Sequence, residues 1–134
     1  MPVIKAETLP IKESADLVKT RQSVRTWASE LGFSLVDQTK MVTAASELAR
    51  NAYIHGRGGT LCWEIVERDA RRGLKLRFAD EGPGIPNMDL ALTDGWTSGT
   101  GLGMGLSGAR RLVNDFEIDS KVGAGTRVTI TRWK

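Results

Sequence analysis

The 134-residue chain has one cysteine, one histidine and no long apolar run. The single cysteine excludes an internal disulfide, and the short apolar runs exclude a signal peptide and a membrane span. The net charge of +3 is carried by scattered Lys and Arg residues, so no basic stripe indicates nucleic-acid binding. We therefore expect a cytoplasmic protein with no nucleic-acid partner and no membrane partner.

Basic residues are missing from one long segment, because residues 78–109 contain neither Lys nor Arg. The chain also lacks any Gly-Lys dipeptide, which excludes a Walker P-loop. A phosphate bound by residues 78–109 would be neutralised by a metal ion, by backbone N–H groups or by arginines outside the segment. Arg50, Arg110 and Arg111 are the candidates.

Glycine, by contrast, is abundant in the stretch GTGLGMGLSG, residues 99–108, which leads into an amphipathic pattern. Ordering glycine costs chain entropy, and glycine offers no side chain for packing, so a core helix or strand would not favour it. The stretch therefore indicates that a ligand approaches the backbone closely. The unpaired N–H groups at the start of a helix favour a phosphate. A surface loop is the alternative. Gly103–Gly108 also fits G-x-G-x-x-G, but too few residues follow it to complete a dinucleotide-binding sheet.

Hydrophobic periodicity predicts one α+β domain over residues 1–134. The predicted helices cover residues 13–31 and 34–56, and the predicted strands cover residues 3–10, 60–67, 74–80, 115–121 and 126–133. A loop over residues 68–73 and a turn over residues 122–125 close two hairpins, and a further helix follows the glycine stretch. This order predicts a two-layer sandwich, a mostly antiparallel mixed sheet with helices on one face.

Three polar residues of the second predicted helix, Glu47, Asn51 and His55, recur at a spacing of four and so share one face. A carboxylate and a carboxamide in this arrangement can orient a hydroxyl group or water and coordinate Mg²⁺ through oxygen. A solvated helix face would show the same pattern.

Asp80 ends a predicted strand on the same side as its apolar residues Leu76 and Phe78. The alternation places a carboxylate at the inner end of an apolar row, directly before the glycine-rich residues 81–85. A buried carboxylate needs hydrogen-bond donors, and an adenine amino group is one. The alternative is an aspartate that only starts a turn.

The chain contains three motifs in order: SELARN at residues 46–51, DEGPGIP at residues 80–86 and GLGMGLSG at residues 101–108. Together they resemble the conserved boxes of the GHKL ATP-binding superfamily (gyrase, Hsp90, histidine kinases and MutL). Within it they are most similar to the switch serine kinases of stressosome pathways. The resemblance covers nearly the whole chain. It implies the Bergerat fold, ATP and Mg²⁺ as ligands, phosphorylation of a serine on a STAS-domain partner, and activation of a PP2C-type phosphatase by binding.

The resemblance also implies roles for individual residues. Asp80 would bind the adenine amino group, with Thr126 near the same edge of the base. Asn51 would hold Mg²⁺, Glu47 would act as the general base and His55 would pack against the nucleoside. The base pocket would be shaped by Gly82, Gly84 and Ile85, and the phosphates would be wrapped by Gly99, Thr100, Gly101, Leu102, Gly103, Met104, Gly105 and Leu106.

Three other functions remain open on the sequence alone. An anti-sigma factor of the same superfamily would hold a sigma factor and release it to an antagonist. A histidine kinase catalytic domain would need its phosphoacceptor in trans, because the chain has one histidine and no preceding dimerisation helix. A nucleotide-free scaffold would leave the three motifs without a purpose. The residues of the first two motifs, SELARN and DEGPGIP, favour the switch kinase.

Overall fold

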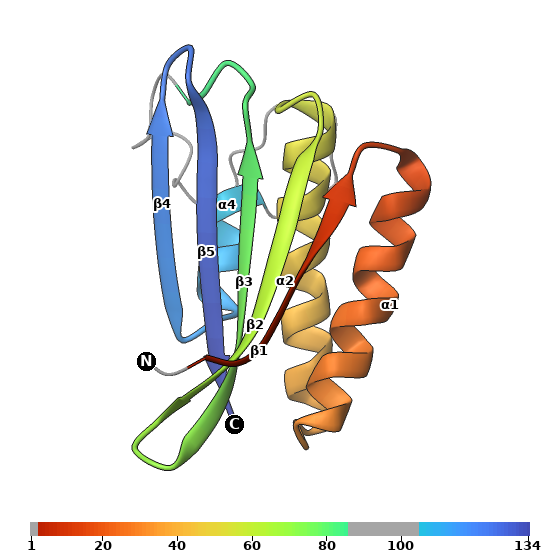
Figure 1. Cartoon of the computed structure of the whole chain (residues 1–134), viewed down its shortest axis with the longest axis vertical. Helices are drawn as coiled ribbons and strands as arrows, with labels where there is room; N and C mark the ends of the chain where they lie inside the picture. The colour runs from red at the N-terminus through yellow and green to blue at the C-terminus, as the bar shows by residue number, and fades with distance from the viewer. Residues whose placement is uncertain (1–2, 86–104) are drawn as a thin grey trace.

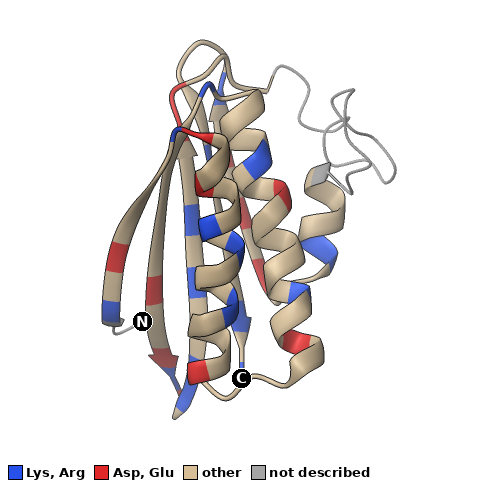
Figure 2. Ribbon diagram, turned by 90° about the vertical axis from the view of Figure 1, so that its right-hand side faces the viewer, with Lys and Arg blue, Asp and Glu red and all other residues tan. Residues whose placement is uncertain are grey.

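The computed structural model describes residues 3–85 and 105–134, which form two layers (Figure 1). A five-stranded sheet is one layer, and helices packed on one of its faces are the other; both are visible after a turn of 90° (Figure 2). In chain order the elements are β1 (Val3–Ile11), α1 (Ser14–Glu30), α2 (Leu35–Ile54), β2 (Gly59–Arg68), β3 (Arg71–Asp80), α4 (Gly105–Arg111), β4 (Asp115–Lys121) and β5 (Gly125–Trp133). In this described part of the chain, every helix is too short or too polar to cross a bilayer.

The described strands pair antiparallel throughout, in the order β1-β2-β3-β5-β4, so the predicted two-layer α+β architecture is confirmed. The central strand β3 pairs with β2 on one side and β5 on the other. Its last residue, Asp80, lies opposite Thr126 of β5. The sheet register thus brings together two residues that are 46 positions apart in the sequence (126 minus 80).

The connection between β2 and β3 is shorter than predicted. Instead of a loop over residues 68–73, Asp69 and Ala70 alone separate the strands, with positive φ angles of 52° and 64°. Two residues with positive φ match the turn that suits the twist of a hairpin. Gly73 lies inside β3 opposite Trp133, where a Cβ would come within 2.7 Å of the indole ring. The glycine makes room for a ring and not for a turn, which is why the prediction was wrong.

The core lies between the sheet and α2, and small side chains line the helix. Its members from α2 are Met41, Ala44, Ala45, Leu48, Ala49 and Ala52, and those from β2, β3 and β5 are Leu61, Trp63, Leu74, Leu76, Phe78, Val128 and Ile130. Trp27 of α1 stacks on Trp63, with 4.0 Å between ring centroids. Each large apolar side chain buried here contributes about 1.5–3 kcal/mol. This packing fixes α2 against β2 and β3 along its length.

Polar contacts fix the beginning of α2. The Ser34 hydroxyl accepts a hydrogen bond from the Asp37 N–H at 3.1 Å, which makes Ser34 the N-cap of the helix. Arg132 of β5 donates to Asp37 Oδ1 at 2.7 Å and to the carbonyl oxygen of Leu112, just after α4, at 2.9 Å. One arginine therefore ties α2, α4 and the sheet together at the end where α2 begins.

Candidate functional site

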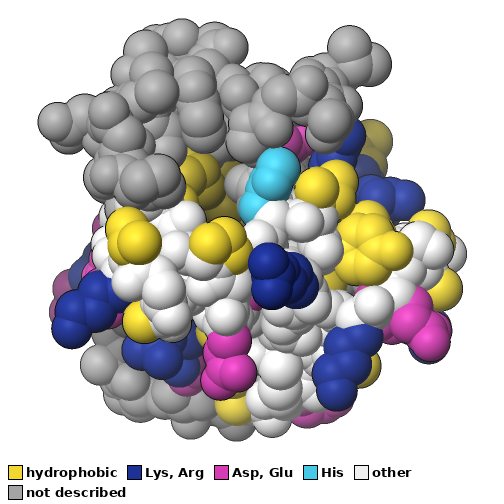
Figure 3. Space-filling model, turned by 90° about the horizontal axis from the view of Figure 1, so that it is seen from above, with side chains coloured by type: hydrophobic (Ala, Val, Ile, Leu, Met, Phe, Trp, Pro, Cys, Tyr) yellow, Lys and Arg dark blue, Asp and Glu magenta, His cyan; other side chains and the backbone are white. Residues whose placement is uncertain are grey.

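Three segments meet at the end of the molecule where α2 and β3 finish, opposite the two chain termini (Figure 1). They are the end of α2, the loop over residues 81–85 and the turn between β4 and β5. Figure 3 looks onto this end, where His55, the single histidine of the chain, is exposed. The described candidate residues other than Glu47, Gly105 and Leu106 lie in or beside these segments.

Asp80 presents its two carboxylate oxygens to different surroundings. Oδ1 accepts a hydrogen bond from the Gly82 N–H at 2.9 Å, so the turn that formed the alternative interpretation is present. For Oδ2, the described residues supply no hydrogen-bond donor. The side chain is half-buried on the core side of the sheet. A half-buried carboxylate with an available oxygen is suited to an N–H group of a ligand.

Gly56, which follows the C-cap of α2, determines how closely the helix end approaches Asp80. A methyl group at Gly56 would overlap the carboxylate carbon of Asp80. Gly82 packs on the same spot, since a Cβ there would lie 2.6 Å from the Gly56 Cα and 3.0 Å from the His55 carbonyl oxygen. The helix end and the loop therefore touch through their backbones beside the carboxylate. In the sequence, Gly56 is only the last residue of the predicted helix 34–56, and its contact with Asp80 was missed.

The polar face of α2 ends beside the contact between Gly56 and Asp80. Glu47 and Asn51 lie one turn apart and are half-buried, and His55 is the C-cap residue. The Asn51 carbonyl oxygen accepts hydrogen bonds from the N–H groups of His55 and Gly56, at 2.9 and 3.1 Å. The two N–H groups that follow Ile54 are thus bonded back to the last turn of the helix, beside Asp80.

The side chains of Glu47 and Asn51 fit Mg²⁺ by chemistry. Mg²⁺ prefers oxygen ligands and is usually held by one or two protein groups together with substrate phosphates. Glu47 and Asn51 offer a carboxylate and a carboxamide oxygen on one helix face. Within residues 3–85 and 105–134, no three His, Cys, Asp or Glu side chains are grouped as a metal cage.

The loop over residues 81–85 is attached to the turn between β4 and β5. The Gly123 N–H donates to the Pro83 carbonyl oxygen at 2.8 Å. Gly84 has a φ of 78°, and a Cβ at this position would overlap the carbonyl oxygen of Lys121. Only glycine combines this backbone conformation with so close an approach. The two glycines of the second motif therefore serve different backbone contacts, Gly82 with the end of α2 and Gly84 with the β4–β5 turn.

Ser120 of β4 is a second residue that sequence reasoning missed. Its hydroxyl oxygen accepts a hydrogen bond from the Ile85 N–H at 2.8 Å and lies 2.9 Å from the Thr126 hydroxyl oxygen. Ile85 is half-buried and packs against the core. Ser120 thus connects the second motif to the threonine opposite Asp80. No local pattern marks this serine, because its partners lie 35 and six residues away.

The predicted phosphate-binding residues are described only in part. Those that lie outside the described residues are Gly99, Thr100, Gly101, Leu102, Gly103 and Met104. Gly105 is the first residue of α4, so the helix predicted to follow the glycine stretch begins inside it. Leu106 is 4% exposed and belongs to the core, which leaves its backbone, and not its side chain, for contact with a ligand.

The candidate arginines are spread over two helices. Arg110 and Arg111 are exposed in the last turn of α4, at the end away from Gly105. Arg50 is half-buried on α2, between Glu47 and Asn51 in the sequence.

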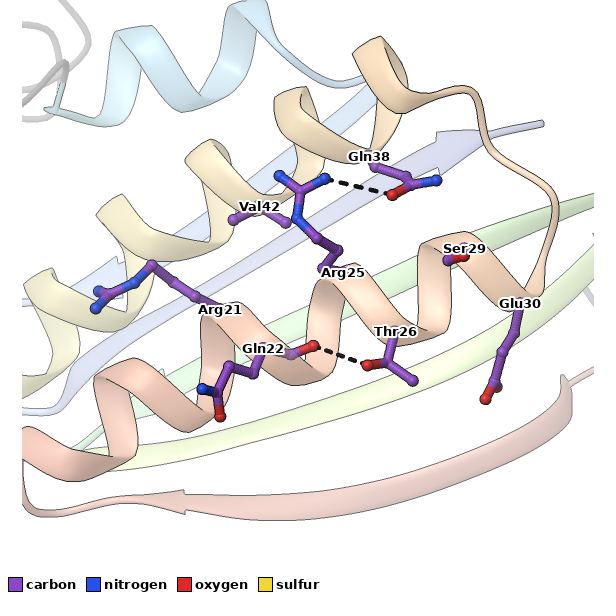
Figure 4. Close-up of a pocket in the computed structure, with 8 residues that line it drawn as sticks. All are labelled: Arg21, Gln22, Arg25, Thr26, Ser29, Glu30, Gln38 and Val42. Atoms are coloured by element: carbon purple, nitrogen blue, oxygen red, sulfur yellow. Dashed lines mark hydrogen bonds between the residues drawn. The ribbon is translucent and has the colours of Figure 1, made fainter.

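Two hollows elsewhere on the described surface contain none of the predicted site residues. One, of about 630 Å³, lies between α1 and α2 and is lined in part by Arg21, Arg25 and Val42 (Figure 4). Arg25 reaches across it and donates to Gln38 Oε1 at 3.3 Å. The other, of about 410 Å³, lies over β3, β4 and β5 and includes Lys75. The described candidate residues therefore lie outside both hollows.

Comparison with known proteins identifies the family of the chain. The model of the histidine kinase-, DNA gyrase B- and HSP90-like ATPases matches residues 36–134, which include every described candidate residue. The chain belongs to this family. This GHKL protein is 42% identical over 118 residues to the serine/threonine-protein kinase RsbT of Bacillus subtilis, covering 88% of this chain and 89% of RsbT. It is 34% identical to an anti-sigma F factor of Clostridium acetobutylicum, covering 84% of this chain and 81% of the relative.

Solved structures show the same fold. A Mycobacterium tuberculosis protein solved as its RsbU and RsbW domains superposes on all of this GHKL chain with a TM-score of 0.65 and 22% identity. The match takes up 33% of the length of that protein. The mycobacterial sensor histidine kinase MprB gives a TM-score of 0.57 with 18% identity, over 96% of this chain and 97% of MprB.

Proposed function

We propose that this GHKL protein is an ATP-dependent serine/threonine protein kinase that works by partner switching. Its protein substrate would be a serine of a STAS-domain partner, and it would bind and activate a PP2C-type phosphatase. The proposal takes residues 1–134 as one kinase domain that acts in the cytoplasm, where ATP is available. The observation that carries it is the 42% identity to a serine/threonine kinase over nearly the full length of both chains.

ATP binding would use the junction of α2, β3 and the β4–β5 turn. The Oδ2 atom of Asp80 would accept from the adenine amino group, with Thr126 at the same edge of the base. The walls of the base pocket would come from His55, Gly82, Gly84 and Ile85. The backbone of residues 99–106 would bind the phosphates. This assignment is supported by the Asp80 oxygen, which lacks a donor among the described residues.

Phosphoryl transfer would use the polar face of α2. Asn51 would hold Mg²⁺, which when bound neutralises the phosphate charge that residues 78–109, without Lys or Arg, leave uncompensated. Glu47 would accept the proton of the serine hydroxyl while the serine oxygen attacks the γ-phosphorus and ADP leaves. Its position one turn before Asn51 on the same helix supports this pairing.

Single-turnover transfer from radiolabelled ATP to a STAS-domain partner tests the proposal through Glu47→Gln. A positioned general base contributes about 10²–10⁴-fold, so we expect transfer to fall by that factor while ATP affinity stays nearly unchanged. Glu30→Gln, an exposed substitution at the end of α1, is the control and should transfer normally. A wild-type rate in Glu47→Gln would remove Glu47 from the mechanism.

A second candidate function, nucleotide-dependent sequestration of a sigma factor, is favoured by the likeness to anti-sigma F factors. The two functions differ in what the wild-type protein does with ATP and its partner. Stable capture of a sigma factor, together with no transfer to any STAS-domain protein, would favour the anti-sigma function. Transfer without sigma-factor binding would favour the switch kinase.

A further inference from the structure

We propose that Ser120 is a positioning residue that directs the Thr126 hydroxyl group and so makes the base pocket selective for an exocyclic amino group. The inference rests on the proposed ATP site and adds to it a residue that the three motifs do not contain. Ser120 lies on β4 directly opposite Thr126, which in turn lies opposite Asp80 of β3. Three neighbouring strands therefore present these side chains in one row.

The hydrogen-bond partners of Ser120 determine where its single proton lies. The Ile85 N–H donates to the Ser120 oxygen at 2.8 Å, so the serine accepts there. The Gly125 carbonyl oxygen, at 3.2 Å, can only accept, and we assign the Ser120 proton to it. In the third contact, at 2.9 Å, either hydroxyl could donate, and with this assignment the donor is Thr126. The serine hydroxyl is then fully used, with one proton donated and two accepted.

The same assignment determines what Thr126 offers to a ligand. Because its proton is donated to Ser120, its oxygen has only lone pairs for other partners. Asp80, opposite it on β3, is a carboxylate whose Oδ2 can also only accept. Directly paired residues on neighbouring antiparallel strands have Cβ atoms about 4.5–5.5 Å apart. The row thus presents two neighbouring acceptors and no donor.

Two acceptors match an amino group, which has two N–H bonds. A purine with a carbonyl group at the same position brings a third acceptor and leaves it without a donor. A pocket of fixed hydrogen-bond polarity discriminates strongly, since the wrong ligand leaves buried polar groups unpaired. Without Ser120, the Thr126 hydroxyl could rotate and donate to a carbonyl, so the discrimination would weaken.

Calorimetry with three nucleotides separates selectivity for the amino group from a general effect of Ser120 on the loop over residues 81–85. In the presence of Mg²⁺, we would compare ATP, inosine triphosphate with a carbonyl at position 6, and purine riboside triphosphate with hydrogen there. For the wild type we expect ATP to bind at least tenfold more tightly than purine riboside triphosphate. Ser120→Ala should reduce the preference for ATP over purine riboside triphosphate about three- to tenfold, which is the range for one lost hydrogen bond. The same variant should bind inosine triphosphate more tightly relative to ATP than the wild type does.

Further variants give the inference its controls. Thr126→Val should reduce the preference for ATP by a similar factor, and the double variant should reduce it no further, because both changes break one interaction. Ser120→Thr, which keeps the hydroxyl, should retain the preference. Thr129→Val, on the opposite face of β5, should leave the preference unchanged. Thr126→Val also provides the test if Ser120→Ala fails to fold.

The outcomes distinguish this inference from the proposed function. If Ser120→Ala weakens ATP and purine riboside triphosphate by the same factor, Ser120 only supports the Ile85 loop and the inference is wrong, although the ATP site stands. If the wild type binds none of the three nucleotides, the proposed ATP site itself is wrong and the inference falls with it.

Discussion

The two oxygens of Asp80 have different surroundings, and this decides what a substitution there measures. Oδ1 holds the Gly82 N–H and Oδ2 faces no donor among the described residues. Asparagine keeps one acceptor oxygen, so it can preserve the turn while it removes the charge and the second acceptor. A change in nucleotide affinity in that variant would therefore report on the ligand and not on the loop.

We expect Asp80→Asn to weaken ATP binding about tenfold to a hundredfold, because a hydrogen bond to a charged group is worth roughly 1.5–3 kcal/mol. Calorimetry measures the effect, with circular dichroism to show that the fold is kept. Asp119→Asn, on an exposed aspartate of β4, is the matched control and should bind ATP as the wild type does. Unchanged ATP affinity in Asp80→Asn would contradict the assignment of Asp80 to the adenine.

At the residue scale, the sequence identified side chains whose chemistry stands out locally. Asp80 interrupts an apolar alternation, and Glu47 and Asn51 repeat at helical spacing. Gly56 and Ser120 were missed, since a glycine at a helix end and a serine in a strand are common for many reasons. Their significance comes from neighbours that are 24 and 35 positions away, Asp80 and Ile85 (80 minus 56, and 120 minus 85).

At the scale of elements, periodicity predicted β1, α1, α2, β2, β4 and β5 to within a few residues, but it misplaced the boundary before β3. There a buried glycine was mistaken for a turn residue, because the ring that covers it lies at the far end of the chain. The N-terminus of α1 gave a weaker signal. Its first turn is closed by Asp16, whose Oδ2 accepts from the N–H groups of Lys12 and Glu13 at 2.9 and 3.0 Å.

These hydrogen bonds make the stability of α1 depend on pH. The N–H groups of Lys12 and then Glu13 stabilise the ionised carboxylate, so the pKa of Asp16 lies below its ordinary value. A lowered pKa stabilises the folded state above the unfolded-state pKa of about 3.9, and this stabilisation is lost as the pH falls through the folded-state pKa. The contribution is therefore complete at neutral pH and disappears in acid.

We expect Asp16→Asn to lower the melting temperature at pH 7, and the difference from the wild type to shrink as the pH falls below about 4. Thermal unfolding followed by circular dichroism over this pH range measures both effects. Asp69→Asn, in the exposed turn between β2 and β3, should follow the wild-type pH curve. A difference that stays constant down to low pH would show that the charge of Asp16 has no part in capping the helix.

At the scale of the whole molecule, the site is made by the convergence of separate elements. Core packing holds α2 against β2 and β3, and Arg132 fixes its beginning against β5. As a result, the end of α2 has a defined position relative to Asp80. A ligand that bridges α2, β3 and β5 would bind only the folded state and would raise its stability by mass action.

We expect ATP with Mg²⁺ to raise the melting temperature of the wild type, and ATP alone to raise it less. At a free concentration of 100 times Kd the stabilisation is about 2.7 kcal/mol. In Asn51→Ala the effect of Mg²⁺ should be largely lost, since the metal loses its proposed protein ligand. Gln22→Ala, exposed on α1, is the control. A full Mg²⁺ effect in Asn51→Ala would mean that Asn51 has a structural role only.

The sequence by itself determined the element types, the faces of the strands and the three motifs, because each of these depends on residues close together in the chain. Side-chain alternation was enough to place Asp80 on the core side of its strand. Only the tertiary structure decided that Gly56 meets the carboxylate and that Ser120 holds both Ile85 and Thr126. These contacts depend on strand order and register, which follow from the burial of the whole core and leave no periodic trace in the chain.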